Sequence, residues 1–352
     1  MILVFITSFG LTYFVISNYR FDAEIDQTQK ITSQEVSEKP EKNLNTEIII
    51  KEIEVSNFSE LISNLGSHRT LIITDSIKIT QGLIDNFNLL KWIPDPYDKE
   101  MAYLGLDSKY YQIKSSTNFS FAQRDTLSPK EILFKGDTYL RIINTEKLSL
   151  EGIPSKDIGI TIDNDNSPVL GFKGNTNLFI TNLNLVHTLP IGDDCGLYAP
   201  VLAFKEDLNV NINNCSLNGS GTEGIFAREV NVINVSESTI YNCSHNGIYL
   251  IDTEQCNITH SIFQNNKIDN HLFVLKNSNL NITSSLIAGN ETWEGEFIHI
   301  YDEDKNDSSS FYFSDCTIKE NKNFKMNTSM FKDFGASNSI QFSDFIQIEA
   351  EK

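Results

Sequence analysis

Positive charge is scarce in this chain. Of its 352 residues, 28 are Lys or Arg and 47 are Asp or Glu, so the formal net charge is −19. Five residues are arginine. Nucleic-acid phosphates and anionic lipid headgroups attract basic surfaces. The composition therefore argues against nucleic acid as a partner and against adsorption on an anionic membrane surface.

Cysteine motifs are also missing. The five cysteines form no Cys-x-x-Cys pair and no Cys/His spacing typical of zinc ligands, and their odd number argues against a disulfide framework. The sequence contains no phosphate-binding loop, nucleophile elbow or zinc-protease motif. No cofactor is predicted from these motifs, and calcium is considered below.

What the sequence does contain is a repeat between Asn177 and Lys322. Six similar segments end on an apolar residue, which we call the anchor, and successive anchors are 23 to 32 residues apart. Apolar residues also stand five and seven positions before each anchor, and small residues such as Cys215, Ser261 and Cys316 stand two before it. Asparagine follows each of the last three anchors by three positions. The anchors are Leu185, Leu217, Ile240, Phe263, Ile287 and Ile318.

This spacing predicts stacked coils. The positions seven and five before the anchor show the alternation of one strand, and the anchor and the position two before it show that of a second strand. A bend of two polar residues separates the two strands. A third strand follows each anchor, at 224–227, 247–251, 271–275, 296–300 and 330–334. Three short strands per repeat are typical of a parallel β-helix, in which neighbouring coils bury one another's inner face. The fold class predicted is therefore all-β. Cys215, Cys256 and Cys316 are predicted to be buried apolar residues, because coils about 4.8 Å apart hold Cys215 and Cys316 too far from each other for a disulfide.

The same residues carry a resemblance. VLAF (201–204), NVNINNCSLNGSGTEGIFA (209–227), STIYNCSHNGIYLI (238–251), SIFQNN (261–266) and SLIAGN (285–290) resemble right-handed parallel β-helix repeat proteins of bacteria, which share the pectin-lyase-like superfold. The resemblance covers roughly Glu47 to Lys352. It implies a right-handed parallel β-helix, but the superfold hosts lyases, hydrolases, adhesins and members without an assigned reaction, so it does not imply one activity.

The N-terminal stretch differs in composition from the repeat. Residues 1–18 are almost entirely apolar and are predicted to be an export segment, retained as a membrane anchor rather than cleaved. Residues 19–46 are polar and charge-mixed and are predicted to be a flexible linker. The expected location is therefore membrane-anchored and extracytoplasmic, in the cell envelope or secreted.

Residues 47–352 are expected to form one β-helix domain. Within it, 47–80 are predicted to be an N-terminal cap with one short helix, 81–133 an elaboration, and 134–352 the coils. A cap is expected because the open end of a solenoid exposes unpaired backbone and apolar side chains. The C-terminal end shows no helical cap, so side chains there close the coil or a protein partner covers it.

One short motif suggests hydrolysis. Gly192-Asp193-Asp194-Cys195 resembles the Gly-Asp-Asp-Cys block of polygalacturonase-like hydrolases, in which paired carboxylates supply the acid and the base. The downstream His-Gly pair and basic segment of that family have no counterpart at the expected spacing. The nearest downstream histidine is His245, more than two coils away. A solvated loop is therefore the favoured interpretation of Asp193 and Asp194.

Other candidates lie along one edge of the coils. Acidic residues recur after the third strand, beside Lys205, Arg228 and Lys276, so the edge is predicted to be mixed in charge. Arg228 is the one arginine of the repeats, and it joins Glu223 and His245 as candidate catalytic residues. Asp302, Asp304 and Asn306 alternate as oxygen ligands of calcium do, although the segment lacks the Gly and Glu of an EF-hand loop.

The favoured function is an exported, membrane-tethered β-helix that presents an extended surface to a polymer, with a polysaccharide as the leading candidate, and that performs no catalysis. The alternative is a polysaccharide lyase or glycoside hydrolase that acts on an acidic polysaccharide through Asp193, Asp194, Glu223, Arg228 and His245. Convergence of these side chains in a groove would favour the enzyme. A third possibility is an assembly component whose C-terminal coil binds a protein partner.

Overall fold

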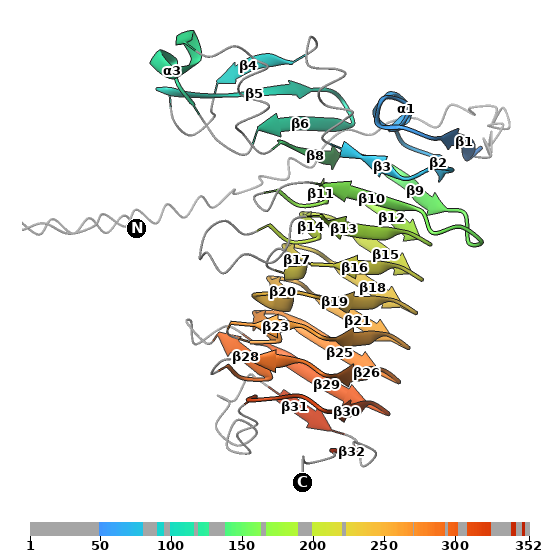
Figure 1. The fold of residues 1–352 in the computed structure, drawn as a ribbon, viewed down its shortest axis with the longest axis vertical. Coiled ribbons are helices and arrows are strands. Elements are labelled where there is room, and N and C mark those ends of the chain that lie inside the picture. The colour runs from blue at the N-terminus through green and yellow to red at the C-terminus, as the bar shows by residue number, and fades with distance from the viewer. Residues whose placement is uncertain are drawn as a thin grey trace, which may run out of the picture. The chain divides into compact units, whose positions relative to one another are not determined.

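The computed structural model shows one continuous stack of strands (Figure 1). It describes residues 49–79, 90–94, 99–115, 119–126, 138–162, 167–188, 199–219, 223–269, 271–292, 295–301, 308–324, 339–342 and 347–348. All of these belong to the compact unit Ile48–Lys352. The predicted export segment, the linker and the strand predicted at 330–334 lie outside the described residues.

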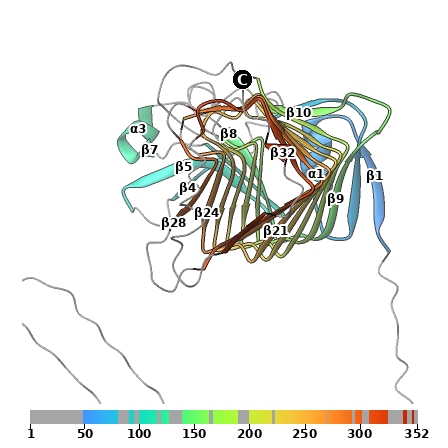
Figure 2. The same cartoon turned by 90° about the horizontal axis from the view of Figure 1, so that it is seen from below.

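Three long sheets run along the stack and enclose its interior (Figure 2). Sheet A joins ten described strands: β1 (Lys51–Val55), β2 (Arg69–Ile73), β9 (Glu146–Gly152), β12 (Thr176–Thr181), β15 (Asn209–Asn213), β18 (Val232–Ser236), β21 (Gln255–Thr259), β25 (Asn279–Thr283), β29 (Ser310–Ser314) and β31 (Ser339–Phe342). Sheet B joins nine: β3 (Ile77–Lys78), β10 (Gly159–Ile162), β13 (Asn184–His187), β16 (Ser216–Asn218), β19 (Thr239–Tyr241), β22 (Ile262–Gln264), β26 (Leu286–Ala288), β30 (Thr317–Lys319) and β32 (Gln347–Ile348).

Sheet C completes each coil. Its strands are β4 (Lys91–Pro94), β5 (Met101–Asp107), β6 (Tyr111–Ser115), β7 (Phe119–Ser120), β8 (Thr138–Ile143), β11 (Leu170–Lys173), β14 (Leu202–Lys205), β17 (Glu223–Arg228), β20 (Asn246–Ile251), β24 (Phe273–Lys276) and β28 (Ile298–Tyr301). A small parallel pair, β23 (Lys267–Ile268) and β27 (Glu291–Thr292), bridges sheets B and C. From β8 to β28 neighbouring strands of sheet C are parallel, whereas β4 to β8 pair antiparallel. The elaboration therefore extends one wall of the stack.

The predicted register is confirmed. Leu217 pairs with Ile240, Ile240 with Phe263, and Phe263 with Ile287, so the anchors form one file along sheet B. The apolar residues of sheet A form two more files, and along both sheets inward residues are buried while their neighbours are partly exposed. A shift of one residue would turn every apolar side chain outward, and burial therefore selects this register.

A short helix, α1 (Phe58–Asn64), belongs to the predicted cap region. Asn57 is its N-cap, because the Asn57 side chain accepts a hydrogen bond from the backbone N–H of Glu60. Phe58, Leu61 and Ile62 are buried in the same apolar core as the coils. A second helix, α3 (Phe121–Thr126), accompanies the antiparallel strands. In the part of the chain that the structure describes, no helix is both long enough and apolar enough to cross a bilayer.

Many corners of the coil contain one residue with a left-handed backbone. Between sheets A and B these residues include Asn214, His260 and Asp315, with φ of 48°, 50° and 54°. The corners after sheet C use Glu229 and Asp252 among others, with φ of 57° and 48°. One left-handed residue turns the chain sharply and lets the next side chain enter the interior. Asn and Asp tolerate this conformation better than other residues with side chains, which accounts for the abundance of Asn at the corners.

The residues that follow the corners form three internal polar stacks, which we call the corner ladders. In each ladder a side chain accepts a hydrogen bond from the backbone N–H at the same corner of the preceding coil. Examples are Ser238 N to Ser261 Oγ at 3.2 Å, Asn266 N to Asn290 Oδ1 at 3.1 Å and Thr253 N to Ser278 Oγ at 3.0 Å. The ladders satisfy buried N–H groups that no strand partner reaches. Cys215 and Cys316 occupy the first of them, and Cys215, Cys243, Cys256 and Cys316 are all buried free thiols.

Asp207 is the one carboxylate among these ladder positions in the described residues. It is fully buried and accepts hydrogen bonds from the backbone N–H and the side-chain amide of Asn175, at 2.7 and 2.9 Å. Burial raises the pKa of Asp207 to about 6, and the hydrogen bonds from Asn175 only partly offset this rise. The folded protein therefore holds a proton on Asp207 at a pH where the unfolded chain has released it.

This difference makes part of the stability depend on pH. Between about pH 4 and pH 6 the folded state binds more protons at Asp207 than the unfolded state, so stability falls as pH rises through this window and is constant above it. The free energy of unfolding of the wild type should fall by on the order of 2–3 kcal/mol across this pH window. We expect Asp207→Asn to abolish this fall. Urea unfolding of both proteins from pH 4 to pH 7 measures it, and every other titrating group cancels in the difference. If the difference in unfolding free energy between the wild type and Asp207→Asn does not change with pH, the expectation is wrong.

Candidate functional site

Several of the predicted site residues lie outside the described residues. These are Asp193 and Asp194, the proposed acid–base pair, and Asp302, Asp304 and Asn306, the proposed calcium ligands. Their predicted roles remain predictions. Glu223, Arg228 and His245 are described, and all three belong to sheet C or to the residues that enter it.

Glu223 and His245 lie at the same end of sheet C, whereas Arg228 lies at the other. Glu223 is the first residue of β17 and pairs with Asn246, the neighbour of His245. Arg228 is the last residue of β17, so five residues, or about 16 Å of extended strand, separate it from Glu223. Glu223 is buried next to Cys243, and burial and the Glu223 charge both raise the pKa of that thiol. The structure therefore brings Glu223 and His245 to one end of the sheet and leaves Arg228 apart.

The edge where sheet C turns into sheet A is mixed in charge, as the sequence suggested. Lys205 and Arg228 pair in register on adjacent strands. The ammonium of Lys205 lies 3.3 Å from a carboxylate oxygen of Glu206, and Nε of Arg228 lies 3.0 Å from Oε1 of Glu229. These pairs are about half exposed and are therefore worth little to stability. In its described residues, the edge is neither a carboxylate cage nor a cationic strip.

The outer surface of sheet A runs along the stack, and we call its part from β12 to β29 the amide face. Each of these six strands directs three side chains outward, and none of these eighteen side chains is charged. Charged residues make up 21% of the chain, so about four charged side chains would be expected among eighteen. The residues are Asn177, Phe179, Thr181, Asn209, Asn211, Asn213, Val232, Asn234, Ser236, Gln255, Asn257, Thr259, Asn279, Asn281, Thr283, Ser310, Tyr312 and Ser314.

Four asparagines along the middle of this face form a hydrogen-bonded row. Nδ2 of Asn234 donates to Oδ1 of Asn211 at 3.1 Å, and Nδ2 of Asn257 donates to Oδ1 of Asn234 at 3.1 Å. Asn281 continues the row with a bond of 3.2 Å to Asn257. An amide has two N–H donors and two oxygen lone pairs, so Asn234 keeps one donor and one acceptor for a ligand. Asn257 keeps one donor, because its Oδ1 also accepts a hydrogen bond from Nε2 of Gln255 at 3.1 Å. Register places Phe179 before the row and Tyr312 after it.

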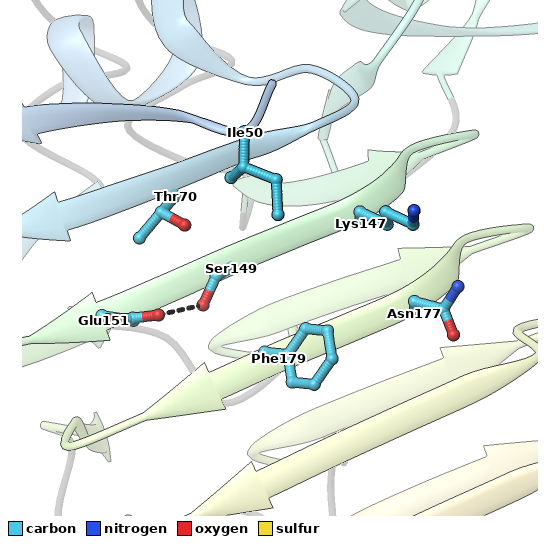
Figure 3. Close-up of a pocket in the computed structure, with 7 residues that line it drawn as sticks. All are labelled: Ile50, Thr70, Lys147, Ser149, Glu151, Asn177 and Phe179. Atoms are coloured by element: carbon cyan, nitrogen blue, oxygen red, sulfur yellow. Dashed lines mark hydrogen bonds between the residues drawn. The ribbon is translucent and has the colours of Figure 1, made fainter. Parts of the chain in front are cut away.

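A groove of about 570 Å³ opens where the amide face meets the first strands of sheet A (Figure 3). Phe179 is 41% exposed and forms its apolar wall together with Ile50. Ser149 and Glu151 lie beside it and are joined by a hydrogen bond of 2.6 Å. Thr70, Lys147 and Asn177 complete the lining. An exposed aromatic ring surrounded by hydroxyl, amide and carboxylate groups is suited to a ligand that has both apolar faces and hydroxyl groups.

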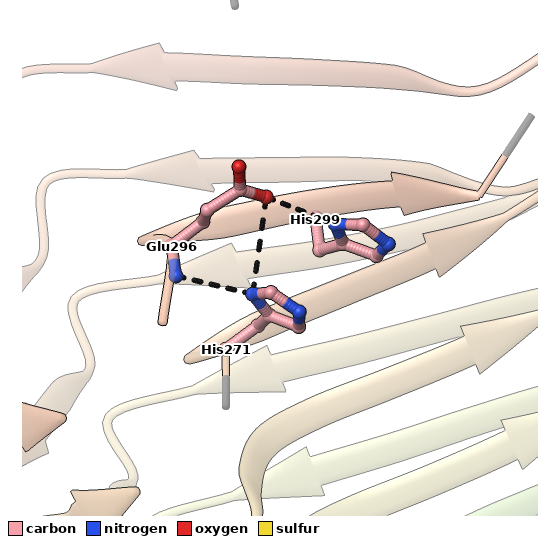
Figure 4. A group of neighbouring side chains, drawn as sticks. All are labelled: His271, Glu296 and His299. Atoms are coloured by element: carbon pink, nitrogen blue, oxygen red, sulfur yellow. Dashed lines mark hydrogen bonds and ion pairs between the residues drawn. The ribbon is translucent and has the colours of Figure 1, made fainter. Parts of the chain in front are cut away.

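A second group of polar side chains lies at the entry of sheet C, which we call the histidine cluster: His271, Glu296 and His299 (Figure 4). The rings of His271 and His299 are stacked, with centroids 4.2 Å apart and planes 10° from parallel. Nδ1 of His299 lies 2.9 Å from Oε2 of Glu296, and the backbone N–H of Glu296 donates to Nδ1 of His271 at 3.1 Å. The three side chains are 21–30% exposed, so solvent reaches them.

Electrostatics keep His271 neutral. Its pKa is lowered to about 4, first by burial and then by the neighbouring His299, while Glu296 acts in the opposite direction. His245, on the preceding coil, lowers it further. Near neutral pH, His271 is therefore a hydrogen-bonding group without charge.

Ligand type makes this cluster a candidate metal site, because two histidines and one carboxylate are common zinc ligands. The directions of the lone pairs do not fit. An imidazole lone pair lies in the plane of its ring, so stacked parallel rings direct theirs side by side rather than at one point. Nδ1 of His271 also already accepts the backbone N–H of Glu296. Both rings would have to turn before they could hold one ion.

Sequence reasoning missed the histidine cluster, although a signal was present. Aligning the third-strand segments HLFVL (271–275) and EFIHI (296–300) places His271 over Glu296, as the pairing of Phe273 with Ile298 confirms. His299 lies on the outer face of β28 and reaches back to both. A search for motifs along the chain cannot find a group whose members come from different coils.

Comparison with known proteins agrees with the fold. Residues 200–348 match the family model described as a right handed beta helix region. The fold is a right-handed parallel β-helix, as the sequence predicted. No curated protein sequence matches it.

Two solved structures are similar at low identity. A pectate lyase from Paenibacillus sp. 0602 aligns over 74% of this chain and 79% of its own length, with 9% identity and a TM-score of 0.39. PfbA, a surface adhesin of Streptococcus pneumoniae, aligns over 84% of this chain and 63% of its own length, with 9% identity and a TM-score of 0.40. At this identity and these TM-scores, neither similarity says what the present chain binds.

Proposed function

We propose that this β-helix binds a polymer, and that the polymer is a polysaccharide without net charge that lies along the amide face. The observation that carries the proposal is the absence of charge from eighteen outward positions of a chain with a net charge of −19. An acidic polymer would be repelled by the protein as a whole and would find no cation on this face. Neutral hydroxyl groups match the donors and acceptors of the amides.

The geometry supports a long ligand. Strands follow one another about every 4.8 Å, so the row from Asn211 to Asn281 repeats its amide groups at regular steps. The amides are held by one another before any ligand arrives, which lowers the entropy lost on binding. Phe179 supplies an apolar platform at one end, against which the face of a sugar ring can pack.

The catalytic alternative has less support among the described residues. Glycoside hydrolysis uses two carboxyl groups roughly 5–10 Å apart. Glu223 and Glu296 stand at equivalent places of their coils but three strand steps apart, which is about 14 Å. Their separation is too large for that chemistry.

Export and membrane anchoring by residues 1–18 are also part of the proposal. Their support is the apolar run and the polar segment that follows it. A protein partner at the C-terminal coil likewise remains a prediction from the sequence.

The test is a binding assay of the full-length protein against neutral and acidic polysaccharides. Phe179→Ala is expected to weaken binding of a neutral polysaccharide about 10-fold, the equivalent of roughly 1.5 kcal/mol for one stacking platform. Phe226→Ala is the matched control, because Phe226 is a partly exposed aromatic residue on the outer face of sheet C, where it contacts Tyr249. Preferential binding of acidic polysaccharides, or equal effects of both substitutions, would overturn the proposal.

A further inference from the structure

The contacts of the histidine cluster assign a different role to each ring. A backbone N–H can only donate, so Nδ1 of His271, which lies 3.1 Å from the amide nitrogen of Glu296, must accept. The proton of the neutral His271 ring is therefore on Nε2. A carboxylate can only accept, so Nδ1 of His299, 2.9 Å from Oε2 of Glu296, must carry a proton. The lone pair of neutral His299 is therefore on Nε2.

The two Nε2 atoms point the same way, away from Glu296 (Figure 4). The stacked rings thus present one proton acceptor and one proton donor side by side on a partly exposed surface. Glu296 bonds to both rings: its backbone N–H donates to Nδ1 of His271, and its carboxylate accepts from Nδ1 of His299. A carboxylate behind a histidine holds the ring in one tautomer and stabilises the imidazolium that forms when the ring takes a proton.

We propose that His271, Glu296 and His299 form an acid–base site that hydrolyses acyl esters. Nε2 of His299 removes a proton from a water molecule as the water oxygen attacks the carbonyl carbon of the ester. The carbonyl electron pair moves to its oxygen, which accepts a hydrogen bond from Nε2–H of His271. The intermediate then expels the alkoxide, which takes the proton from His299, so that one ester and one water become one acid and one alcohol.

The groups present favour this reaction over others. One general base and one neutral donor are what hydrolysis of an acyl carbonyl requires, and a neutral imidazole can polarise a carbonyl without a cation. Glycoside hydrolysis would need a second carboxyl group within reach. The proposal does not depend on polysaccharide binding, because the amide face belongs to sheet A and the histidine cluster to sheet C.

The experiment measures hydrolysis of p-nitrophenyl acetate by the full-length protein. The control is His260→Asn, which removes an exposed histidine at a corner between sheets A and B where Asn tolerates the left-handed backbone. Exposed imidazoles hydrolyse this ester slowly, so the control measures that background. We expect the wild type and His260→Asn to share one rate, and His299→Ala to lose about 100-fold in kcat.

Three further measurements separate chemistry from folding. Free imidazole should restore part of the activity of His299→Ala, which a merely structural role would not allow. His271→Gln and Glu296→Gln should lower kcat about 10-fold with little change in KM, because they act on the transition state. Their circular dichroism and urea midpoints should match the wild type.

Three results would overturn the proposal. The first is a wild-type rate no higher than that of an equal concentration of free imidazole. The second is unchanged hydrolysis in folded His299→Ala. The third is activity that a chelator abolishes and zinc restores, which would make the cluster a metal site.

Discussion

Phe273→Ala is expected to destabilise the β-helix by about 3–5 kcal/mol, the usual cost of removing a buried aromatic ring. Phe273 is fully buried in the core at the start of β24. Its ring centroid lies 5.1 Å from that of Phe263, 5.5 Å from Phe297 and 5.9 Å from Phe311. These partners belong to three different coils, so the cavity would weaken the contacts that join neighbouring coils.

Urea unfolding followed by circular dichroism measures the effect. Phe179→Ala is the matched control, because Phe179 is 41% exposed on the amide face and its loss should cost less than about 1 kcal/mol. The same control shows whether the variant used in the binding assay is folded. Similar midpoints for Phe273→Ala and Phe179→Ala would contradict the description of the core.

Asn266→Ala is expected to cost about 3–5 kcal/mol, although asparagine is a polar residue. Asn266 is fully buried in a corner ladder. Its Oδ1 accepts from the backbone N–H of Cys243 at 2.9 Å, and its Nδ2 donates to Oδ1 of Asn290 at 2.8 Å and to the carbonyl of Ile240 at 3.3 Å. Alanine would leave the N–H of Cys243 buried without its acceptor, and each such group costs about 1–3 kcal/mol.

The amide face provides the control for this prediction. Asn257 makes the same kind of amide–amide bonds, at 3.1 and 3.2 Å, but it is partly exposed, so water can replace its partners. Asn257→Ala should therefore cost less than about 1 kcal/mol. Amide hydrogen exchange gives a local readout, because the N–H of Cys243 should lose protection in Asn266→Ala and keep it in Asn257→Ala. Equal costs for the two substitutions would show that burial does not distinguish the ladders.

The two proposals can fail separately. Polysaccharide binding depends on Phe179 and the asparagine row of sheet A, and ester hydrolysis depends on His299, Glu296 and His271 beside sheet C. A protein that binds a neutral polysaccharide and does not hydrolyse the ester would retain the first proposal alone. The opposite result would retain the second alone.

Much of the architecture could be predicted from the order of residues. The file Leu217, Ile240, Phe263 and Ile287 was predictable because apolar side chains at fixed spacing have one inward arrangement, and a slip of one residue would expose them all. The polar bends were predictable because asparagine and its neighbours favour turns. Burial and backbone preference act within one coil, so one coil's sequence reveals them.

The outer surface is different, because only the tertiary structure determined which exposed side chains lie next to one another. His271, Glu296 and His299 come from two coils, and no burial requirement fixes the direction of their side chains. Glu223 and Arg228 are five residues apart in sequence yet lie at opposite ends of a strand, while Phe179 and Ile50 are far apart in sequence yet line one groove. The order of residues determined the coil, its register and its corners through burial. Stacking of the coils determined which exposed groups became neighbours, because exposed positions carry no comparable energetic signature in the sequence.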